Sequence, residues 1–487
     1  MSETKKSSMW LVHLIVMLLL MFGFRYIPAP APITPYGMAV LGVFLGMIYG
    51  WCVPNPTNIY PSLLGLFALC TTGYGTGMTV LEGFLGNSTI GLLITGMFIM
   101  PPIMDSGLTN YLFAKILGSK FCHGKPWRVV LTLQVGLLAL MFLVNPLLVC
   151  ILAFAFYQKL FEIAGYTKNE LFPAFMNMGM LINMGISSMH FPWTGMALIP
   201  MGAIQRATGL IWPFTPYLLA VIPFIIVSCS GWYLVMRFFP GCDADKLGNV
   251  NIADLVGDNG NKMSKTQKGA LVFLAVYILT CITTALFSSA TGNAVQQFLN
   301  TVGIYGVNLL AVALLAVVPV DGKPLLNVQS AAKQFPWDLV VLFAAALLVG
   351  GTLTSAEAGI SAFLLAKLGP TLVQFNGIAF FIVVAVIMMI LTNLLNNAAV
   401  MVAMSSLIAT MFLNGVIDET TMYISACIIA VVGDMGFLHP GSSAASAMFF
   451  GQSGMTGRTA YTASITSCLY CIIMTIVMLV PLANIFY

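Results

Sequence analysis

Charged residues are scarce in this sequence. Only 7% of the 487 residues are Asp, Glu, Lys or Arg, whereas 59% are hydrophobic, and the mean hydropathy is +0.97. A soluble domain carries about 25% charged residues, so most of this surface does not face water. Only α-helices and closed β-barrels satisfy their backbone in lipid, and the apolar runs here are continuous rather than alternating. The composition therefore predicts an all-α polytopic membrane protein and gives no indication of a nucleic-acid partner.

Cysteine pairs with metal-ligand spacing and the common catalytic signatures are absent. The 10 cysteines are scattered, mostly inside apolar runs, as at Cys150, Cys281, Cys427 and Cys471, which is typical of small core residues. The sequence has no His-Glu-x-x-His, no Gly-x-Ser-x-Gly and no phosphate-binding glycine-rich loop. These absences argue against an intramembrane enzyme and against ATP-driven transport, and no cofactor is expected.

The apolar segments predict where the helices lie, because a spanning helix needs about 20 apolar residues. No small-residue cleavage site follows the first segment, so we expect a helix there and not a signal peptide. Two apolar stretches, 127–163 and 376–413, are interrupted at 144–146 (VNP) and 396–397 (NN). Short amphipathic helices are expected at 106–118 and 358–369. Spanning helices are expected near 9–25, 36–53, 59–78, 88–104, 171–206, 213–237, 268–290, 302–320, 337–355, 421–450 and 458–484.

The placement of basic residues suggests the topology. If the two interrupted stretches are re-entrant hairpins and the N-terminus is cytoplasmic, only Arg25, Arg206 and Lys367 of the 19 lysines and arginines fall outside. This is the distribution that the positive-inside rule requires. We therefore expect about eleven transmembrane helices plus two re-entrant hairpins, in a bacterial inner membrane. The polar segment 241–267 then becomes a cytoplasmic linker between two halves.

The two halves resemble each other at an offset of 252 residues. Segment 107–115 (GLTNYLFAK) corresponds to 359–367 (GISAFLLAK), and Asn145 corresponds to Asn397. With the offset changed by one, 183–185 (NMG) corresponds to 434–436 (DMG). The first segment ends inside and the second outside in the expected topology, so the repeats are inverted. Inverted repeats with paired broken helices are typical of secondary transporters that bind substrate near the membrane midplane.

Polar residues interrupt the apolar runs at four places, 144–146, 187–195, 391–398 and 433–446. Polar groups at membrane depth are costly and are functional candidates by default. A helix break also frees backbone N–H groups that favour an anion and carbonyl groups that can coordinate Na⁺. A channel would show a continuous polar pore, whereas these groups form four short clusters, which favours a transporter.

The fourth polar region carries a resemblance to a known family. Segment 437–446 (FLHPGSSAAS), followed by 450–454 (FGQSG), stands where the divalent anion:sodium symporter family has Phe-x-x-Pro-x-x-Thr-Pro-Pro-Asn and then Phe-Gly-Ser-Gly. Segment 336–343 (PWDLVVLF) is also similar, and hydropathy and element order agree over nearly the whole chain. These proteins carry di- and tricarboxylates and sulfate. The resemblance implies a homodimeric elevator in which a transport domain slides against a scaffold domain within the lipid bilayer.

The resemblance also divides the chain. It implies scaffold helices and the first amphipathic helix in 1–118, and a first transport half in 119–240. After the linker 241–267, it implies scaffold helices with the second amphipathic helix in 268–369 and a second transport half in 370–487.

The predicted site departs from the family pattern. The family has Ser-Asn-Thr at each hairpin tip, whereas this chain keeps only the central Asn145 and Asn397. The first sodium site of the family maps near Leu140 and Val144, which are apolar, so this site appears damaged because hard cations prefer oxygen ligands. The second sodium site retains Thr392, Asn397 and the backbone near Ser442, with Asn145 as a further Na⁺ candidate. The expected substrate-binding residues are Asn145, Pro146, Thr194, Asn396, Asn397, Ser443, His190 and His439.

Three interpretations of the missing ligands stay open. The protein is a sodium-independent exchanger, or a proton or another cation replaces sodium, or the substrate is not a standard dicarboxylate. For the second interpretation, His190, His439 and Asp434 are the candidate groups, because imidazole titrates near neutral pH and Asp434 is an acid inside an apolar helix. The small organic anion expected first is a di- or tricarboxylate. The alternative function is a cation:proton antiporter of a related inverted-repeat fold that uses Asp434 and His439.

Overall fold

The structure is a computed structural model that describes most of the chain. The described residues are 3–52, 59–86, 88–117, 125–143, 146–191, 195–249, 262–286, 293–333, 335, 337–353, 355–360, 362–363, 366, 375, 377–394, 397–438, 442–443, 446, 449–450 and 455–487.

The first half of the chain is helical throughout its described part. Helix α1 continues into a π-helical turn and then a 3-10 turn, η1 (Leu19–Gly23) and η2 (Phe24–Tyr26). A 3-10 turn, η4 (Gly195–Ala197), precedes α10. The α-helices are α1 (Glu3–Leu18), α2 (Pro35–Cys52), α3 (Ile59–Cys70), α4 (Gly77–Leu85), α5 (Ser88–Asp105), α6 (Leu108–Leu117), α7 (Pro126–Leu143), α8 (Pro146–Ala164), α9 (Leu171–Ser187), α10 (Leu198–Thr208) and α11 (Phe214–Phe238).

The second half repeats this pattern of helices. Its short 3-10 and π elements are η5 (Asp245–Asn249), η6 (Ala356–Ala358) and η7 (Thr475–Leu479). Its α-helices are α13 (Lys265–Leu286), α14 (Ala294–Val317), α15 (Val328–Lys333), α16 (Trp337–Leu353), α18 (Ile378–Leu394), α19 (Asn397–Leu413), α20 (Glu419–Gly433), α22 (Gly457–Met474) and α23 (Val480–Phe486).

One small departure from the all-α prediction lies between α14 and α15. Strands β1 (Pro319–Val320) and β2 (Lys323–Pro324) form an antiparallel hairpin. Asp321 and Gly322 form its turn with φ values of 56° and 85°. Such left-handed conformations at both turn residues are the reason that Asp-Gly is favoured in two-residue hairpin turns. The fold is otherwise helical, as predicted.

Fewer helices than expected are long enough to cross a membrane by length and composition alone. Within the described residues four qualify, namely Pro126–Leu143, Phe214–Phe238, Lys265–Thr284 and Gly457–Phe486. The pair Gly77–Leu85 and Ile90–Asp105, bent by 47°, makes a fifth if it is one span. Eleven spans were expected from hydropathy, and nine further apolar helices among the described residues are only 10–17 residues long, shorter than a typical span. The multi-pass character of the protein is confirmed, while the number of spans is not.

Three predicted spans end early or are divided in the structure, and two of them, 171–206 and 421–450, were predicted to be broken helices. The predicted helix 59–78 ends at Cys70, and α4 is a separate helix that was not predicted. The predicted helix 421–450 ends at Gly433. The predicted helix 171–206 becomes α9 and α10, which agrees with the break expected near 187–195.

The element bounds repeat at the offset seen in the sequence. Helix α18 begins 252 residues after α7, and α15, α16, α19 and α20 follow in the order of α4, α5, α8 and α9. Helices α7 and α8 pack against each other, as do α18 and α19, so each interrupted stretch is a pair of packed helices. The two hairpins are thus present as helix pairs, while their re-entry into the membrane and the inversion of the repeats stay predictions.

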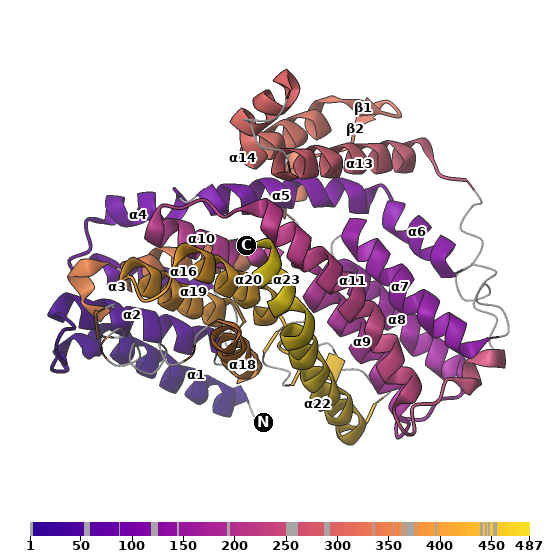
Figure 1. Ribbon diagram of the computed structural model, residues 1–487, viewed down its shortest axis with the longest axis horizontal. Coiled ribbons are helices and arrows are strands. Elements are labelled where there is room, and N and C mark those ends of the chain that lie inside the picture. The colour runs from indigo at the N-terminus through magenta and orange to yellow at the C-terminus, as the bar shows by residue number, and fades with distance from the viewer. Residues whose placement is uncertain are drawn as a thin grey trace.

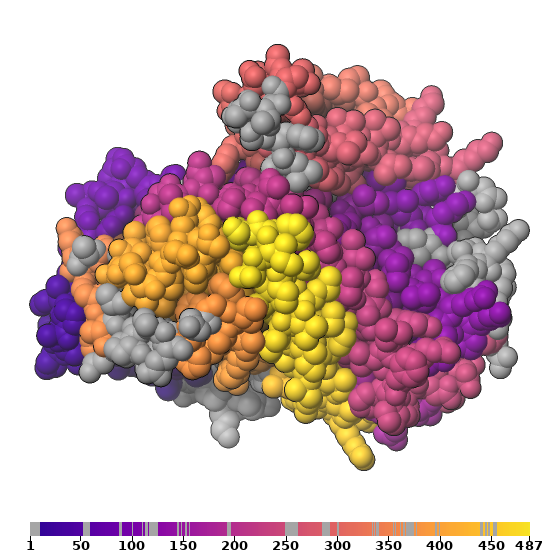
Figure 2. Space-filling model, viewed as in Figure 1, coloured from indigo at the N-terminus to yellow at the C-terminus, as the bar shows by residue number. Residues whose placement is uncertain are grey.

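The halves interlock rather than forming two separate bodies. Helix α10 from the first half packs on α19 and α20 from the second, and α22 packs on α9. Figure 1 shows α13, α14 and the β-hairpin as an uppermost group beyond α5, which contacts α13, α14, α10 and α16. Figure 2 shows the C-terminal helices as a continuous band between the first-half and second-half surfaces.

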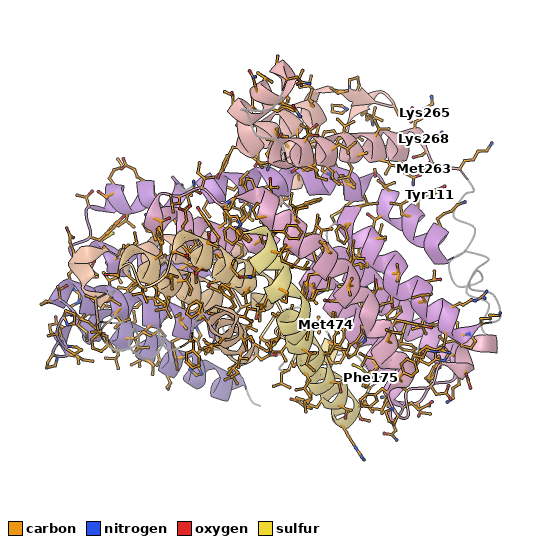
Figure 3. The ribbon with its side chains drawn as sticks, viewed as in Figure 1. Tyr111, Phe175, Met263, Lys265, Lys268 and Met474 are labelled. Carbon is orange, nitrogen blue, oxygen red and sulfur yellow. The ribbon has the colours of Figure 1, made fainter. Side chains whose placement is uncertain are left out.

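The polar segment after α11 is packed at its start. Lys246 lies 2.8 Å from a carboxylate oxygen of Glu170 and donates a hydrogen bond to the carbonyl of Gly165. Cys242 and Leu247 are buried, so this part of the predicted linker belongs to the folded body. Residues 250–261 lie outside the described residues. Figure 3 shows the chain returning at Met263 and Lys265, near Tyr111 of α6.

Candidate functional site

The two broken helices meet where α9 and α20 end. Gly185 lies one turn before the end of α9, and a Cβ atom added to it would lie 2.8 Å from the backbone oxygen of Asp434. The same atom would lie 3.1 Å from the ring of Phe437. Glycine at position 185 therefore permits an approach that a larger residue would prevent, and it brings the predicted breaks at 187–195 and 433–446 into contact.

Asp434 connects the two halves through hydrogen bonds. Ser188 Oγ donates to Asp434 Oδ2 at 2.7 Å, and Asn397 Nδ2 donates to Asp434 Oδ1 at 3.0 Å. Ser188 follows α9, whereas Asn397 begins α19 of the second hairpin. The acid predicted as a cation or proton candidate therefore lies beside the hairpin asparagine predicted for substrate and sodium. Ser188 was not predicted as a site residue.

Ser188 and Asp434 interrupt two runs of buried residues. Residues 172–187 of α9 and 422–433 of α20 are all buried, whereas Ser188 and Asp434 are partly exposed. All acidic residues with described side chains are exposed, except Glu170 and Asp434, which are partly exposed. Glu170 has Lys246 as an ion-pair partner. In the described part of the chain, Asp434 has no such partner, and its hydrogen bonds come from neutral groups.

Thr392 gathers three oxygen atoms next to Asp434. Its Oγ1 lies 2.8 Å from Asn397 Oδ1 and 2.6 Å from the carbonyl oxygen of Gly433. A hydroxyl group has one proton, so it can donate to only one of these two acceptors at a time. Thr392 and Asn397 are both buried, and they are the two side chains predicted for the second sodium site.

Ser442 and Ser443 lie around the carbonyl group of Gly436. Ser442 Oγ donates to this oxygen at 2.7 Å, and Ser446 Oγ donates to the same oxygen. Ser443 Oγ donates to Ser446 Oγ at 3.0 Å. A Cβ atom on Gly436 would lie 2.7 Å from Asn397 Oδ1, so this glycine permits the close approach of Ser442 and Asn397. Neither Gly436 nor Ser446 was predicted as a site residue.

His190 is packed among aromatic rings. Its ring centroid lies 5.1 Å from that of Phe142 and 4.2 Å from that of Phe191. Its Nδ1 is within hydrogen-bond distance of the backbone oxygen of Ser187. Among the described residues, the contacts of His190 are thus with packing groups and do not include Asp434. A role of His190 in binding stays a prediction.

The other predicted residues differ in how far the structure describes them. Asn145, Thr194, Asn396 and His439 lie outside the described residues. Pro146 is the first residue of α8, where proline is favoured because the first helical N–H groups need no partner within the helix. Pro146 has no N–H group, so its backbone cannot donate a hydrogen bond to an anion.

The equivalent place in the first half is apolar and closed. Positions 140 and 141, which correspond to 392 and 393, are Leu140 and Met141, and both side chains are buried. Asn183, the counterpart of Asp434, is fully buried and exchanges hydrogen bonds of 2.8 Å with Gln134. The oxygen cluster therefore exists only in the second half of the described site. No group of three His, Cys, Asp or Glu side chains that could hold a metal ion occurs among the residues described.

Comparison with known proteins identifies the family. Residues 57–432 match the family model described as citrate transporter. The fold is similar to the crystal structure of the YdaH transporter of Alcanivorax borkumensis, with a TM-score of 0.59 and 14% sequence identity over 92% of this chain and 98% of that chain. No curated protein matches the sequence.

These matches confirm a transporter and not an enzyme, and they favour a carboxylate cargo over the cation:proton antiporter alternative. The divalent anion:sodium symporter assignment is confirmed only at the coarser level of citrate carriers. Since the family model covers well over half of the sequence, this chain belongs to the citrate transporter family.

Proposed function

We propose that this protein carries citrate or a closely related di- or tricarboxylate together with a cation, and that both bind where the broken helices meet. The observation that carries this proposal is the pair Ser188 and Asp434, which is partly exposed between two otherwise buried helix ends. Polar groups at helix breaks near the midplane are the usual location of substrate and coupling ions in secondary transporters. Family membership supports the carboxylate as cargo.

The charge of Asp434 argues for a coupled cation. A carboxylate substrate next to an ionised Asp434 would place like charges together in a poorly solvated site, which is strongly unfavourable. No described lysine or arginine forms an ion pair with Asp434 that could offset this repulsion. A proton or metal cation on Asp434 would remove it. The carboxylate of Asp434, which has no ion-pair partner among the described residues, thus favours cation coupling over sodium-independent exchange.

The hydrogen-bond pattern suits either a proton or Na⁺. Ser188 Oγ lies 2.7 Å from both Asp434 Oδ2 and the carbonyl oxygen of Gly185, although it has one proton to donate. A protonated Asp434 would donate to Ser188, and Ser188 would then donate to Gly185. Equally, the oxygen atoms of Thr392, Asn397 and Gly433 are the hard ligands that Na⁺ prefers.

The movement that accompanies transport is proposed to be that of an elevator. The hairpin helices α18 and α19 pack on α20, and α22 packs on both α18 and α9, so the helices that carry Asn397, Asp434 and Ser188 belong to one packed unit. This unit would move together against the remaining helices. A homodimer is proposed from the family resemblance, and a cytoplasmic N-terminus from the distribution of basic residues.

Uptake into proteoliposomes tests the proposal. Labelled citrate, other di- and tricarboxylates and sulfate are offered with and without a sodium gradient, a proton gradient or internal unlabelled substrate. We expect citrate uptake that depends on one of the cation gradients. The variant Asp434→Asn should lose gradient-driven uptake, whereas Asp418→Asn, at the exposed N-terminus of the same helix α20, should retain it. Gradient-independent exchange by the wild type, or normal driven uptake by Asp434→Asn, would contradict the proposal.

A further inference from the structure

Asn393 is a buried side chain that joins three parts of the second half. It lies near the end of α18, and its Oδ1 accepts hydrogen bonds from the backbone N–H groups of Phe437 and Leu438 at 2.9 and 2.8 Å. Its Nδ2 donates to the carbonyl oxygen of Met435 at 3.2 Å. Cys468 Sγ of α22 lies 3.6 Å from the same Oδ1. One carboxamide thus contacts α18, the segment after α20, and α22.

These contacts replace hydrogen bonds that the helix break removes. Helix α20 ends at Gly433, so the N–H groups of Phe437 and Leu438 have no partner in a continuing helix. The N–H group of Phe437 also donates to the carbonyl oxygen of Met435 at 3.1 Å, so the amide of Leu438 is the one that depends more on Asn393. A buried N–H group without a partner is costly. A carboxamide has an acceptor with two lone pairs and two donors, so Asn393 can serve two N–H groups and one carbonyl group together. Aspartate would keep the acceptors and lose the donors, while alanine would lose both.

Asn393 and its neighbour Thr392 hold the backbone on both sides of Asp434. Thr392 Oγ1 is 2.6 Å from the carbonyl oxygen of Gly433, immediately before the acid. Asn393 contacts residues 435, 437 and 438, immediately after it. The backbone that carries Asp434 is therefore fixed to the end of α18 from two directions.

The first half has no such arrangement. The position that corresponds to Asn393 is Met141, whose Sδ accepts a weak hydrogen bond from Ser187 Oγ at 3.6 Å. The counterpart of Asp434, Asn183, is held instead by Gln134. Among the described residues, a carboxamide that bonds the backbone after the broken helix thus occurs in the second half, which bears the charge.

We infer that Asn393 is a positioning residue of the transport site, which holds the segment after α20 so that Asp434 faces Ser188 and Asn397. The inference rests on the proposed function for its effect on transport, and on geometry alone for its effect on the segment 435–438. Asn393 itself acts through Asp434, because its side chain contacts backbone groups, Met389 and Cys468.

The test compares Asn393→Ala and Asn393→Asp with Asn308→Ala. Asn308 is a matched control, because it is fully buried, accepts from Tyr277 Oη at 2.8 Å and contacts Thr95 at 3.3 Å, in helices α14, α13 and α5. We expect Asn393→Ala to raise the concentration of coupling cation needed for half-maximal citrate uptake by about tenfold or more, from the lost hydrogen bonds. Asn308→Ala should lower thermal stability and leave this concentration unchanged.

Amide hydrogen exchange gives a readout that does not depend on transport. In Asn393→Ala the amides of Phe437 and Leu438 should exchange about tenfold faster or more, and maleimide should label Cys468 faster. Asn393→Asp retains the acceptor oxygen for the two N–H groups, and its second oxygen faces the carbonyl groups of Met389 and Met435. It should therefore preserve much of the amide protection at a pH low enough to protonate the new carboxyl group, and lose it when that group ionises. Neither change is expected in Asn308→Ala.

The outcomes separate this inference from the proposed function. If the wild type does not carry citrate but exchange at Phe437 and Leu438 rises in Asn393→Ala, the proposed function fails and the positioning of the segment stands. If Asn393→Ala shows wild-type amide exchange, the inference is overturned. The inference is also overturned if the wild type carries citrate and the cation dependence of Asn393→Ala matches that of Asn308→Ala.

Discussion

The contact between Gly185 and Asp434 makes a sharp prediction for the variant Gly185→Ala. The added methyl group would lie 2.8 Å from the backbone oxygen of Asp434, whereas ordinary contacts begin at 3.4 Å. The ends of α9 and α20 would have to separate by about half an ångström, since a backbone oxygen cannot rotate away as a side chain can. Overpacking of this kind costs about 1–3 kcal/mol.

This separation should also affect transport. Ser188 donates to Asp434 across the same contact at 2.7 Å, and a shift of this size would lengthen the bond beyond the usual range. A hydrogen bond to a charged group contributes about 1.5–3 kcal/mol, which corresponds to about tenfold or more in affinity. We therefore expect Gly185→Ala to lower both the apparent melting temperature in detergent and the rate of citrate uptake per folded protein.

Two other glycines serve as controls. A Cβ atom on Gly179, in the same helix, would lie 2.6 Å from Gln134 Oε1 and 2.7 Å from Trp232, so Gly179→Ala is similarly crowded but distant from Asp434. Gly96 has open space around it, so Gly96→Ala should be neutral. Thermal unfolding and uptake are measured for all three variants. If Gly185→Ala transports as well as Gly179→Ala at equal stability, the site does not depend on the contact between the two breaks.

Three further predictions concern other contacts. In Gly351→Val the new side chain would collide with Arg206, because a Cβ atom at position 351 would lie 2.7 Å from Arg206 Cδ. The free energy of unfolding should fall by about 1–3 kcal/mol. An unchanged melting curve would refute this packing. Partial burial raises the pKa of Glu170, but hydrogen bonds from Lys246 and Thr167 outweigh it and leave the pKa below its ordinary value of 4.5. The stability that the ionised Glu170 contributes to the folded protein is therefore present above pH 4.5 and is lost as the pH falls through the lowered pKa. When the stability of Glu170→Gln is measured against pH, this acid-dependent loss should be absent. In Thr392→Val an oxygen atom is replaced by a methyl group of similar size, so any sodium dependence of uptake should weaken about tenfold or more while a proton dependence stays.

Much of the fold follows from local signals in the sequence. Asn and Pro at 144–146 and Asn at 396–397 mark the hairpin breaks, and the described helices end at Leu143 and Leu394 and resume at Pro146 and Asn397. These residues interrupt long apolar runs, so their effect on the helix does not depend on distant contacts. The repeat at an offset of 252 residues is visible for the same reason, because helix bounds are set locally.

The end of α3 shows a local signal that hydropathy conceals. The hydroxyl groups of Thr71 and Thr72 donate back to the carbonyl groups of Ala68 and Leu69, both at 2.7 Å, and Gly73 has a φ of +97°. A Thr-Thr-Gly sequence can thus satisfy the last carbonyl groups and reverse the chain. Because the average hydropathy remains high, a helix to residue 78 was predicted, and the separate helix α4 was missed.

The partners within the site could not be predicted, because they depend on how the two halves pack. Asp434 stands out in the sequence as an acid in an apolar run, but its partner Ser188 is 246 residues away. Ser188 and Asn393 are ordinary polar residues near breaks. Only the packing of α9 against the end of α20, permitted by Gly185, brings these groups together.

The two halves share the positions of their helix breaks, but the polar residues near those breaks differ. Asn183 lies inside α9, where it pairs with Gln134 through neutral groups that are buried, whereas Asp434 directly follows α20. Asp434 is the more costly residue, because a charged group needs a cation or several donors when it leaves water. A costly group that is also partly exposed is of use only if something binds to it. Under the proposed function, the coupled ion would therefore bind in the charged half, next to Ser188 of the neutral half.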